Sequence, residues 1–104
     1  SMEAPKAAAQ HHAEEEAARP QRNQKEERRL RAEVRNRSRE LEREIETLAA
    51  DILEMEQNIS LPEIASDHLR LTELCDQLED ARFHQNELYA EWEKLLEEYG
   101  EYLE

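Results

Sequence analysis

The chain has 104 residues, a formal net charge of −13, and 39% charged against 38% hydrophobic residues. A chain of this length forms one small domain at most. With five aromatic residues and one glycine, it lacks the apolar material for a thick globular core and has the balance typical of long helices or a coiled coil. β-Branched residues are few and no period-2 alternation appears, which disfavours strands. We therefore predict an all-α protein.

The sequence gives no sign of a membrane span or a secretory signal. No apolar run approaches the roughly 18 residues that a spanning helix needs, and no signal-like apolar segment follows the N-terminus. The single cysteine, Cys75, excludes an internal disulfide and a zinc site of the CxxC type. We therefore expect a soluble, cytoplasmic protein without a membrane partner.

The N-terminal residues 1–24 are alanine-rich and polar, and they have no apolar face that could be buried. Ser1-Met2 resembles the remnant of a cleaved purification tag, which predicts that the chain is a piece of a longer protein. We interpret residues 1–24 as this remnant and a flexible linker. His11 and His12 form a candidate metal pair, but no further ligand is fixed beside them, so solvated linker residues are the better interpretation.

A heptad pattern on each side of one proline predicts two long helices joined by a bend. The first helix is expected over residues 25–58, the bend over 59–66, and the second helix over 67–99. Pro62 cannot donate the helical N–H, and it disfavours the α conformation at Leu61 before it. This proline therefore marks the bend.

Several residues around the bend and at the end of the second helix have capping chemistry. Ser60 and Glu63 have the spacing of a capping box, and Ser66 or Asp67 is a second candidate N-cap. Gly100 is placed to end the second helix as the C′ residue of a left-handed cap.

Apolar residues on both helices alternate in spacings of three and four, which is the pattern of a coiled-coil seam. Because a short bend joins the two seams, they are expected to fold into an antiparallel pair. We therefore predict a two-helix antiparallel coiled-coil hairpin over residues 25–104, with Leu48 near Leu78 and Val34 near Trp92. The predicted hairpin core consists of Val34, Leu41, Ile45, Leu48, Ile52, Met55, Leu71, Leu74, Leu78, Leu88, Trp92 and Leu95.

Charge is spread unevenly along the chain. Residues 1–18 carry a net charge of −3, residues 19–43 carry +5, and residues 44–104 carry −15. Antiparallel folding places the basic start of the first helix beside the acidic end of the second, whereas a parallel homodimer would place like charges together. Each surface pair contributes only a few tenths of a kcal/mol, but together they favour the antiparallel orientation. The bend end, residues 44–82, keeps a net charge of −9, which repels nucleic acid and suits a basic protein surface.

The arginine-rich segment 28–43 is the strongest candidate for a binding site. It holds seven arginines, whose guanidinium groups suit phosphates. The seven are distributed around the helix rather than along one stripe, and glutamates interrupt them. The candidate phosphate-binding residues are Arg28, Arg35, Arg39 and Arg43.

The sequence contains no catalytic motif. One glycine excludes the glycine-rich loops that bind nucleotides, and a pair of helices offers no water-excluding cleft for paired carboxylates. Asp80, His84 and Glu87 share a helix face and could touch a metal, but a solvated helix face is the better interpretation. We therefore predict that the chain is not an enzyme and holds no cofactor or metal of its own.

Three stretches of the chain resemble one family. They are KEERRLRAEVRNR at residues 25–37, LEREIETL at 41–48, and LYAEWEKL at 88–95. Together, on either side of a bend, they are similar to the C-terminal helical domain of ABC-F proteins, which are cytosolic ATPases with two tandem ATP-binding cassettes and no transmembrane part.

The resemblance implies that the chain is a non-catalytic accessory arm. ATP and Mg²⁺ would belong to the cassettes of the parent protein, and the implied partners are the ribosome, structured RNA or DNA, and those cassettes. The alternative is a structural coiled-coil module for self-association as a homodimer or for other protein–protein contact. Four residues off the main seam would then become buried in a four-helix bundle: Leu53, Leu69, Tyr89 and Leu96.

Overall fold

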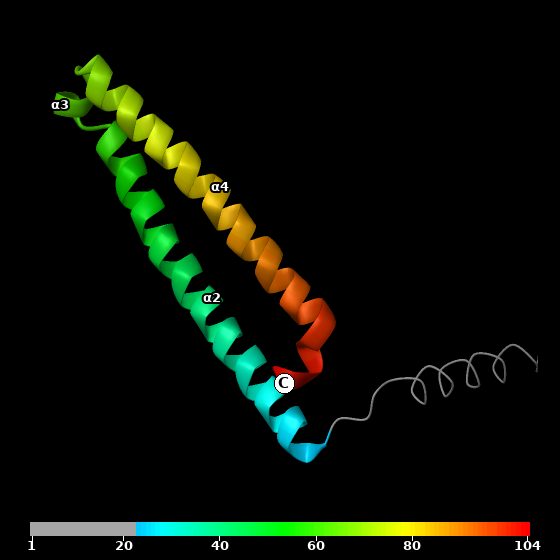
Figure 1. Ribbon diagram of the computed structural model, residues 1–104. Helices are drawn as coiled ribbons and strands as arrows, with labels where there is room; N and C mark the ends of the chain where they lie inside the picture. The colour runs from blue at the N-terminus through cyan, green and yellow to red at the C-terminus, as the bar shows by residue number, and fades with distance from the viewer. Residues whose placement is uncertain (1–22) are drawn as a thin grey trace, which may run out of the picture. The chain divides into compact units, whose positions relative to one another are not determined.

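The computed structural model describes residues 23–104 (Figure 1). Arg31–Glu104 form one compact unit, and residues 23–30 belong to a second one. The helices are α2 (Gln24–Ile59), α3 (Pro62–Ala65), α4 (His68–Tyr99) and the short 3-10 helix η1 (Gly100–Tyr102). No strand occurs among the described residues, so the all-α prediction is confirmed for this part of the chain.

The start of α2 is set by a side-chain cap. The backbone N–H of Glu26 donates to Oδ1 of Asn23 at 2.8 Å, which satisfies one of the helix's unpaired donors. Glu26 and Glu27 in the first turn are placed favourably for the helix dipole. Of the predicted linker over 1–24, only Asn23 and Gln24 are described, and Gln24 already begins α2; His11 and His12 lie outside the described residues.

The bend contains a helical turn that the sequence did not predict. Pro62 occupies the first position of α3, where its missing N–H costs nothing. Leu61 before it is extended, with φ −68° and ψ 132°, and acts as the N-cap residue without a side-chain hydrogen bond. The predicted capping box of Ser60 and Glu63 is therefore wrong, because the helix begins one residue later than that spacing requires.

The start of α4 agrees with one of the two caps considered at this point. Asp67 is the N-cap, and its side chain accepts from the backbone N–H of Arg70 at 3.3 Å. The hydroxyl of Ser66 instead donates to the carbonyl of Pro62 at 2.6 Å. Ser66 thus closes α3, and Asp67 opens α4.

The C-terminal end of α4 does not form the expected left-handed cap. Gly100 has φ −54° and ψ −33°, which is right-handed, and no described residue has a positive φ. The chain continues instead into η1, and the ring of Tyr102 stacks on Tyr99 with centroids 6.1 Å apart. Because Tyr102 is only 7% exposed, its burial favours the right-handed continuation over a cap that would turn the chain away.

Within the unit formed by Arg31–Glu104, α4 packs along α2 (Figure 1). Ile52 of α2 forms a buried cluster with Leu78 and Ala81 of α4, and Leu48 packs against this cluster. All twelve residues of the predicted core are buried or half-buried. Tyr102, Ile64 and Ser38 are buried as well. The core between two helices is thin, so few side chains are fully buried.

Two cross-helix ion pairs give the relative direction of the helices in this unit. Arg37 near the start of α2 pairs with Glu91 near the end of α4, at 2.7 Å. Farther along α2, Glu56 pairs with Arg82, at 3.5 Å. The order of the paired residues is reversed between the two helices. No helix among the described residues is long and apolar enough to cross a membrane.

Candidate functional site

The basic segment of α2 presents three of the four candidate arginines on one flank. Arg35, Arg39 and Arg43 are four residues apart, and side chains at this spacing lie one above the other on a helix. All three are exposed. Neither Arg39 nor Arg43 has an ion pair or hydrogen bond in the described part of the chain, so both guanidinium groups are available to a partner.

Arg35 also binds the chain's own C-terminal end. Its Nε donates to the backbone carbonyl of Tyr102 at 3.1 Å. The guanidinium carbon of Arg31 lies 5.0 Å from the centroid of the Tyr102 ring, which is the geometry of a cation–π contact. The basic segment thus has a structural task, because Arg31 and Arg35 hold η1. Neither Arg31 nor Tyr102 is among the residues that the sequence predicted for the site.

Arg28, the fourth candidate, belongs to the unit that ends at Leu30. Its side chain is exposed, and its Nη2 donates to Oε1 of Gln24 at 3.4 Å, one helical turn earlier. Such a long contact between exposed side chains leaves the guanidinium group accessible to solvent.

Arg37 is the basic residue that is most firmly paired. Its Nε and Nη2 donate to the two carboxylate oxygens of Glu91 at 2.9 and 2.7 Å, and its Nη1 donates to Glu40 at 3.1 Å. The hydrogen bond from Arg37 lowers the pKa of the Glu91 carboxyl, and the bonds to Glu91 and Glu40 raise the pKa of Arg37. A forked pair of this kind has a defined geometry, and it occupies the guanidinium group of Arg37, which is therefore not available to a partner.

An open hollow of about 380 Å³ adjoins the arginine flank. Its polar lining comes largely from hydrogen-bond donors, with one carboxylate, Glu42. The indole Nε1 of Trp92, a residue of this lining, is buried and finds no acceptor among the described residues. The hollow therefore combines positive charge with an apolar wall. Its lining residues are Arg35, Ser38, Arg39, Glu42, Trp92, Leu96 and Leu103.

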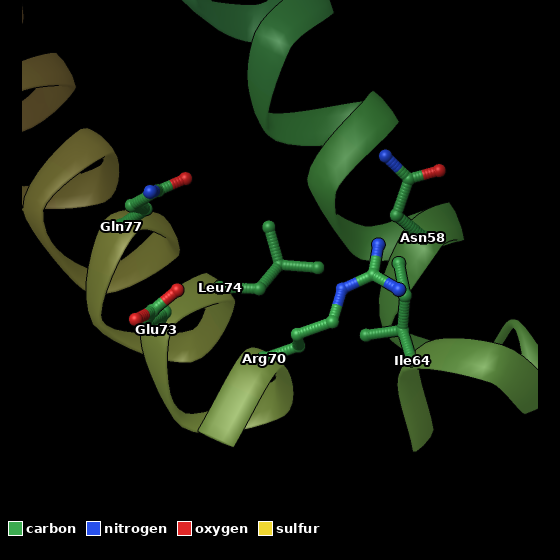
Figure 2. A pocket seen from close by; sticks show the side chains of 6 residues that line it. All are labelled: Asn58, Ile64, Arg70, Glu73, Leu74 and Gln77. Atoms are coloured by element: carbon green, nitrogen blue, oxygen red, sulfur yellow. The ribbon is translucent and has the colours of Figure 1, made fainter. Parts of the chain in front are cut away.

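A second hollow, of about 240 Å³, lies at the bend (Figure 2). Figure 2 shows Arg70 reaching from α4 toward Asn58 and Ile64. Ile64 is 9% exposed and Leu74 is half-buried, so this hollow has an apolar floor under a charged rim. The lining offers amides, one carboxylate and one guanidinium, but no base beside a nucleophile. Its residues are Asn58, Ile64, Arg70, Glu73, Leu74 and Gln77.

The candidate metal trio of α4 does not converge. Nδ1 of His84 lies 3.9 Å from Oε1 of Glu87, and both side chains are well exposed, at 59% and 60%. Residues 23–104 contain no group of three or more His, Cys, Asp or Glu side chains placed to hold a metal ion. Asp80, His84 and Glu87 thus belong to a solvated helix face.

Comparison with known proteins adds one finding to this geometry. A family model described as "ABC transporter C-terminal domain" matches residues 24–97. The matched range starts at the first residue of α2 and ends within the last turn of α4. No curated protein and no solved structure is similar enough to count as a match.

Proposed function

Because the chain belongs to the family of ABC transporter C-terminal domains, we propose that it is the non-catalytic accessory arm of an ATP-binding protein of the ABC-F type. In this proposal α2 and α4 act as an antiparallel helical hairpin, and the arm helps its parent protein to engage the ribosome or another structured nucleic acid in translation-related work. ATP and Mg²⁺ remain with the cassettes of the parent, which are the arm's second contact. In this proposal the protein acts in the cytoplasm.

One observation carries the proposal of phosphate contact. Arg39 and Arg43 are exposed, lie one turn apart on the flank of α2, and have no partner of their own in residues 23–104. Guanidinium groups in this arrangement can each donate two hydrogen bonds to phosphate oxygens. Arg35 and the hollow beside Arg39 extend the same surface toward α4. Arg28, in the unit that ends at Leu30, is a separate candidate for a phosphate contact.

The opposing helix limits how strong this contact can be. Residues 83–104 hold seven glutamates and one lysine, and Glu91 already neutralises Arg37. Glu40 and Glu42 also lie between the free arginines along the sequence. We therefore expect the arm to add a few phosphate contacts to those of the parent protein, with modest affinity when it is tested alone.

The experiment is binding of the purified chain to ribosomes and to a structured RNA, titrated in salt. The variant Arg39→Gln/Arg43→Gln removes the two free guanidinium groups. Arg70→Gln/Lys94→Gln removes the same charge from exposed positions outside the basic segment and is the matched control. The proposal predicts binding that weakens with salt, a smaller salt dependence for the first variant, and wild-type behaviour for the control. Equal loss in both variants would refute a localised phosphate site.

Self-association is the second candidate function, favoured by large apolar side chains that stay exposed in the single chain. Leu53 is 56% exposed and Tyr89 is 43% exposed, so a second copy could cover them in a four-helix bundle. Light scattering across a concentration series distinguishes the two functions. A homodimer that dissociates in Leu53→Ser/Tyr89→Ser supports the structural module, whereas a monomer at all concentrations excludes it.

A further inference from the structure

The side of α4 that faces away from α2 carries a regular line of exposed residues. The core residues Leu71, Leu74 and Leu78 define the side that faces α2. At 100° per residue, six exposed residues lie on the opposite side within about a third of the helix circumference. We call them the outer stripe: Leu69, Glu73, Asp76, Asp80, Phe83 and Glu87. Glu73 lies at the edge of this stripe and also lines the hollow at the bend.

Two large apolar side chains mark this stripe. Leu69 is 69% exposed and Phe83 is 67% exposed. These are the two most exposed large hydrophobic side chains among residues 23–104. Single exposed apolar residues are ordinary on protein surfaces. These two, however, are two heptads apart on one line, separated by about 21 Å at 1.5 Å per residue. An elongated partner that follows the helix could cover both at once.

The carboxylates between them have no partner among residues 23–104. Glu73, Asp76 and Asp80 make no ion pair or side-chain hydrogen bond within residues 23–104. Residues 44–82 around them carry a net charge of −9, with Arg70 and Arg82 as their only bases. Arg82 is already paired with Glu56 at 3.5 Å. The stripe therefore presents apolar contacts inside a strongly negative field.

We propose that the outer stripe binds a basic amphipathic helix of a partner protein. Apolar side chains of that helix would cover Leu69 and Phe83, and its lysines or arginines would meet Glu73, Asp76 and Asp80. The negative field attracts such a segment and repels phosphates, so nucleic acid is excluded as the occupant. A second copy is disfavoured too, because a two-fold contact would set the same carboxylates against one another. This surface is separate from the arginine flank of α2, and the inference does not depend on the function proposed for that flank.

The test uses a synthetic alanine- and lysine-rich helix of about 25 residues, long enough to be partly helical alone, with leucines at two positions 14 residues apart. Fluorescence anisotropy measures its binding to the full chain. The variant Leu69→Ser/Phe83→Ser should weaken binding about tenfold or more, because each exposed side chain contributes buried apolar area. Its matched control is Leu53→Ser, an exposed leucine of α2, which should bind like wild type. A peptide with serines at both leucine positions should lose affinity as the variant does.

The charge arm of the test uses two triple variants of equal charge. Glu73→Gln/Asp76→Asn/Asp80→Asn should weaken binding and flatten its salt dependence. The control changes three exposed glutamates near the end of α4, namely Glu93, Glu97 and Glu98, to Gln, and should have little effect. Circular dichroism checks that all variants keep their helix content.

Three results would overturn the proposal. The first is binding that both charge variants weaken equally, which would show a general attraction to an acidic protein. The second is binding that is unaffected by Leu69→Ser/Phe83→Ser. The third is a dimer in light scattering that this same variant dissociates, which would make a second copy the occupant.

Discussion

Replacing Leu41 with alanine tests the packing of α2 on α4. Leu41 is 0% exposed and is the largest fully buried side chain among residues 23–104. Truncation to alanine removes about three carbon atoms, worth about 2.4 kcal/mol at ~0.8 kcal/mol each. The cavity left behind adds to this loss, although a thin layer of two helices can relax around it. We expect the free energy of unfolding to fall by about 3 kcal/mol.

Such a loss is large for a protein of this size. At ~0.05–0.15 kcal/mol per residue, the unit formed by Arg31–Glu104 has a total stability of about 4–11 kcal/mol. The assay is urea denaturation of the full chain, followed by circular dichroism at the helix band. Leu53→Ala on the same helix is the matched control, because Leu53 is 56% exposed; its effect should stay within about 0.5 kcal/mol. Equal midpoints for the two variants would refute the packing described here.

Three further predictions concern single interactions. A double-mutant cycle on Arg37→Ala and Glu91→Ala should give a coupling of about 0.2–1 kcal/mol, since both side chains are partly exposed. Because the pKa of Glu91 is lowered in the folded protein, this coupling should be complete above the unfolded pKa of about 4.3 and vanish as pH falls through the lowered value; a coupling independent of pH would contradict the ion pair. Asp67→Ala should cost about 1 kcal/mol through loss of the α4 cap, whereas Asp67→Asn should cost much less. Gly100→Ala should be tolerated and raise the melting temperature slightly, because Gly100 is right-handed and an added Cβ meets nothing within 4 Å; marked destabilisation would show that a left-handed conformation forms in solution.

The all-α class and the N-cap of α4 could be predicted from the sequence, because both depend on interactions between residues close together in the chain. The heptad positions of leucine and isoleucine predict which side of each helix is buried when two helices pack together. Asp67 has a side chain that accepts from the next turn, and the chain before Pro62 has to leave the helix.

The errors arose where distant contacts outweigh local preference. Gly100 can adopt a left-handed cap, but the burial of Tyr102 against Arg31 and Arg35 favours a right-handed continuation. Nothing near Gly100 in the sequence indicates that residues about 70 positions earlier would hold the ring. The same distance explains why Arg31 was missed as a contact of the C-terminal end.

Sequence reasoning about the candidate site was limited in another way. It identified a basic segment, but it could not separate arginines that are free from arginines that are already paired. Arg37 looks like its neighbours in the sequence, yet the structure places both oxygens of Glu91 against it. The overall charge distribution predicts pairing of this kind in general, and only the register of α2 on α4 identifies the pair. In this register Arg39 and Arg43 have no ion pair or hydrogen bond among residues 23–104.

The salt dependence of RNA and ribosome binding tests the central claim most directly. For the wild-type chain, the logarithm of the binding constant should fall linearly with the logarithm of salt concentration. In Arg39→Gln/Arg43→Gln the slope should shrink by roughly 1.5, since each lost phosphate contact removes about 0.7–0.9. An unchanged slope, or no binding by the wild-type chain at low salt, would contradict the claim that this arm contacts phosphates through α2.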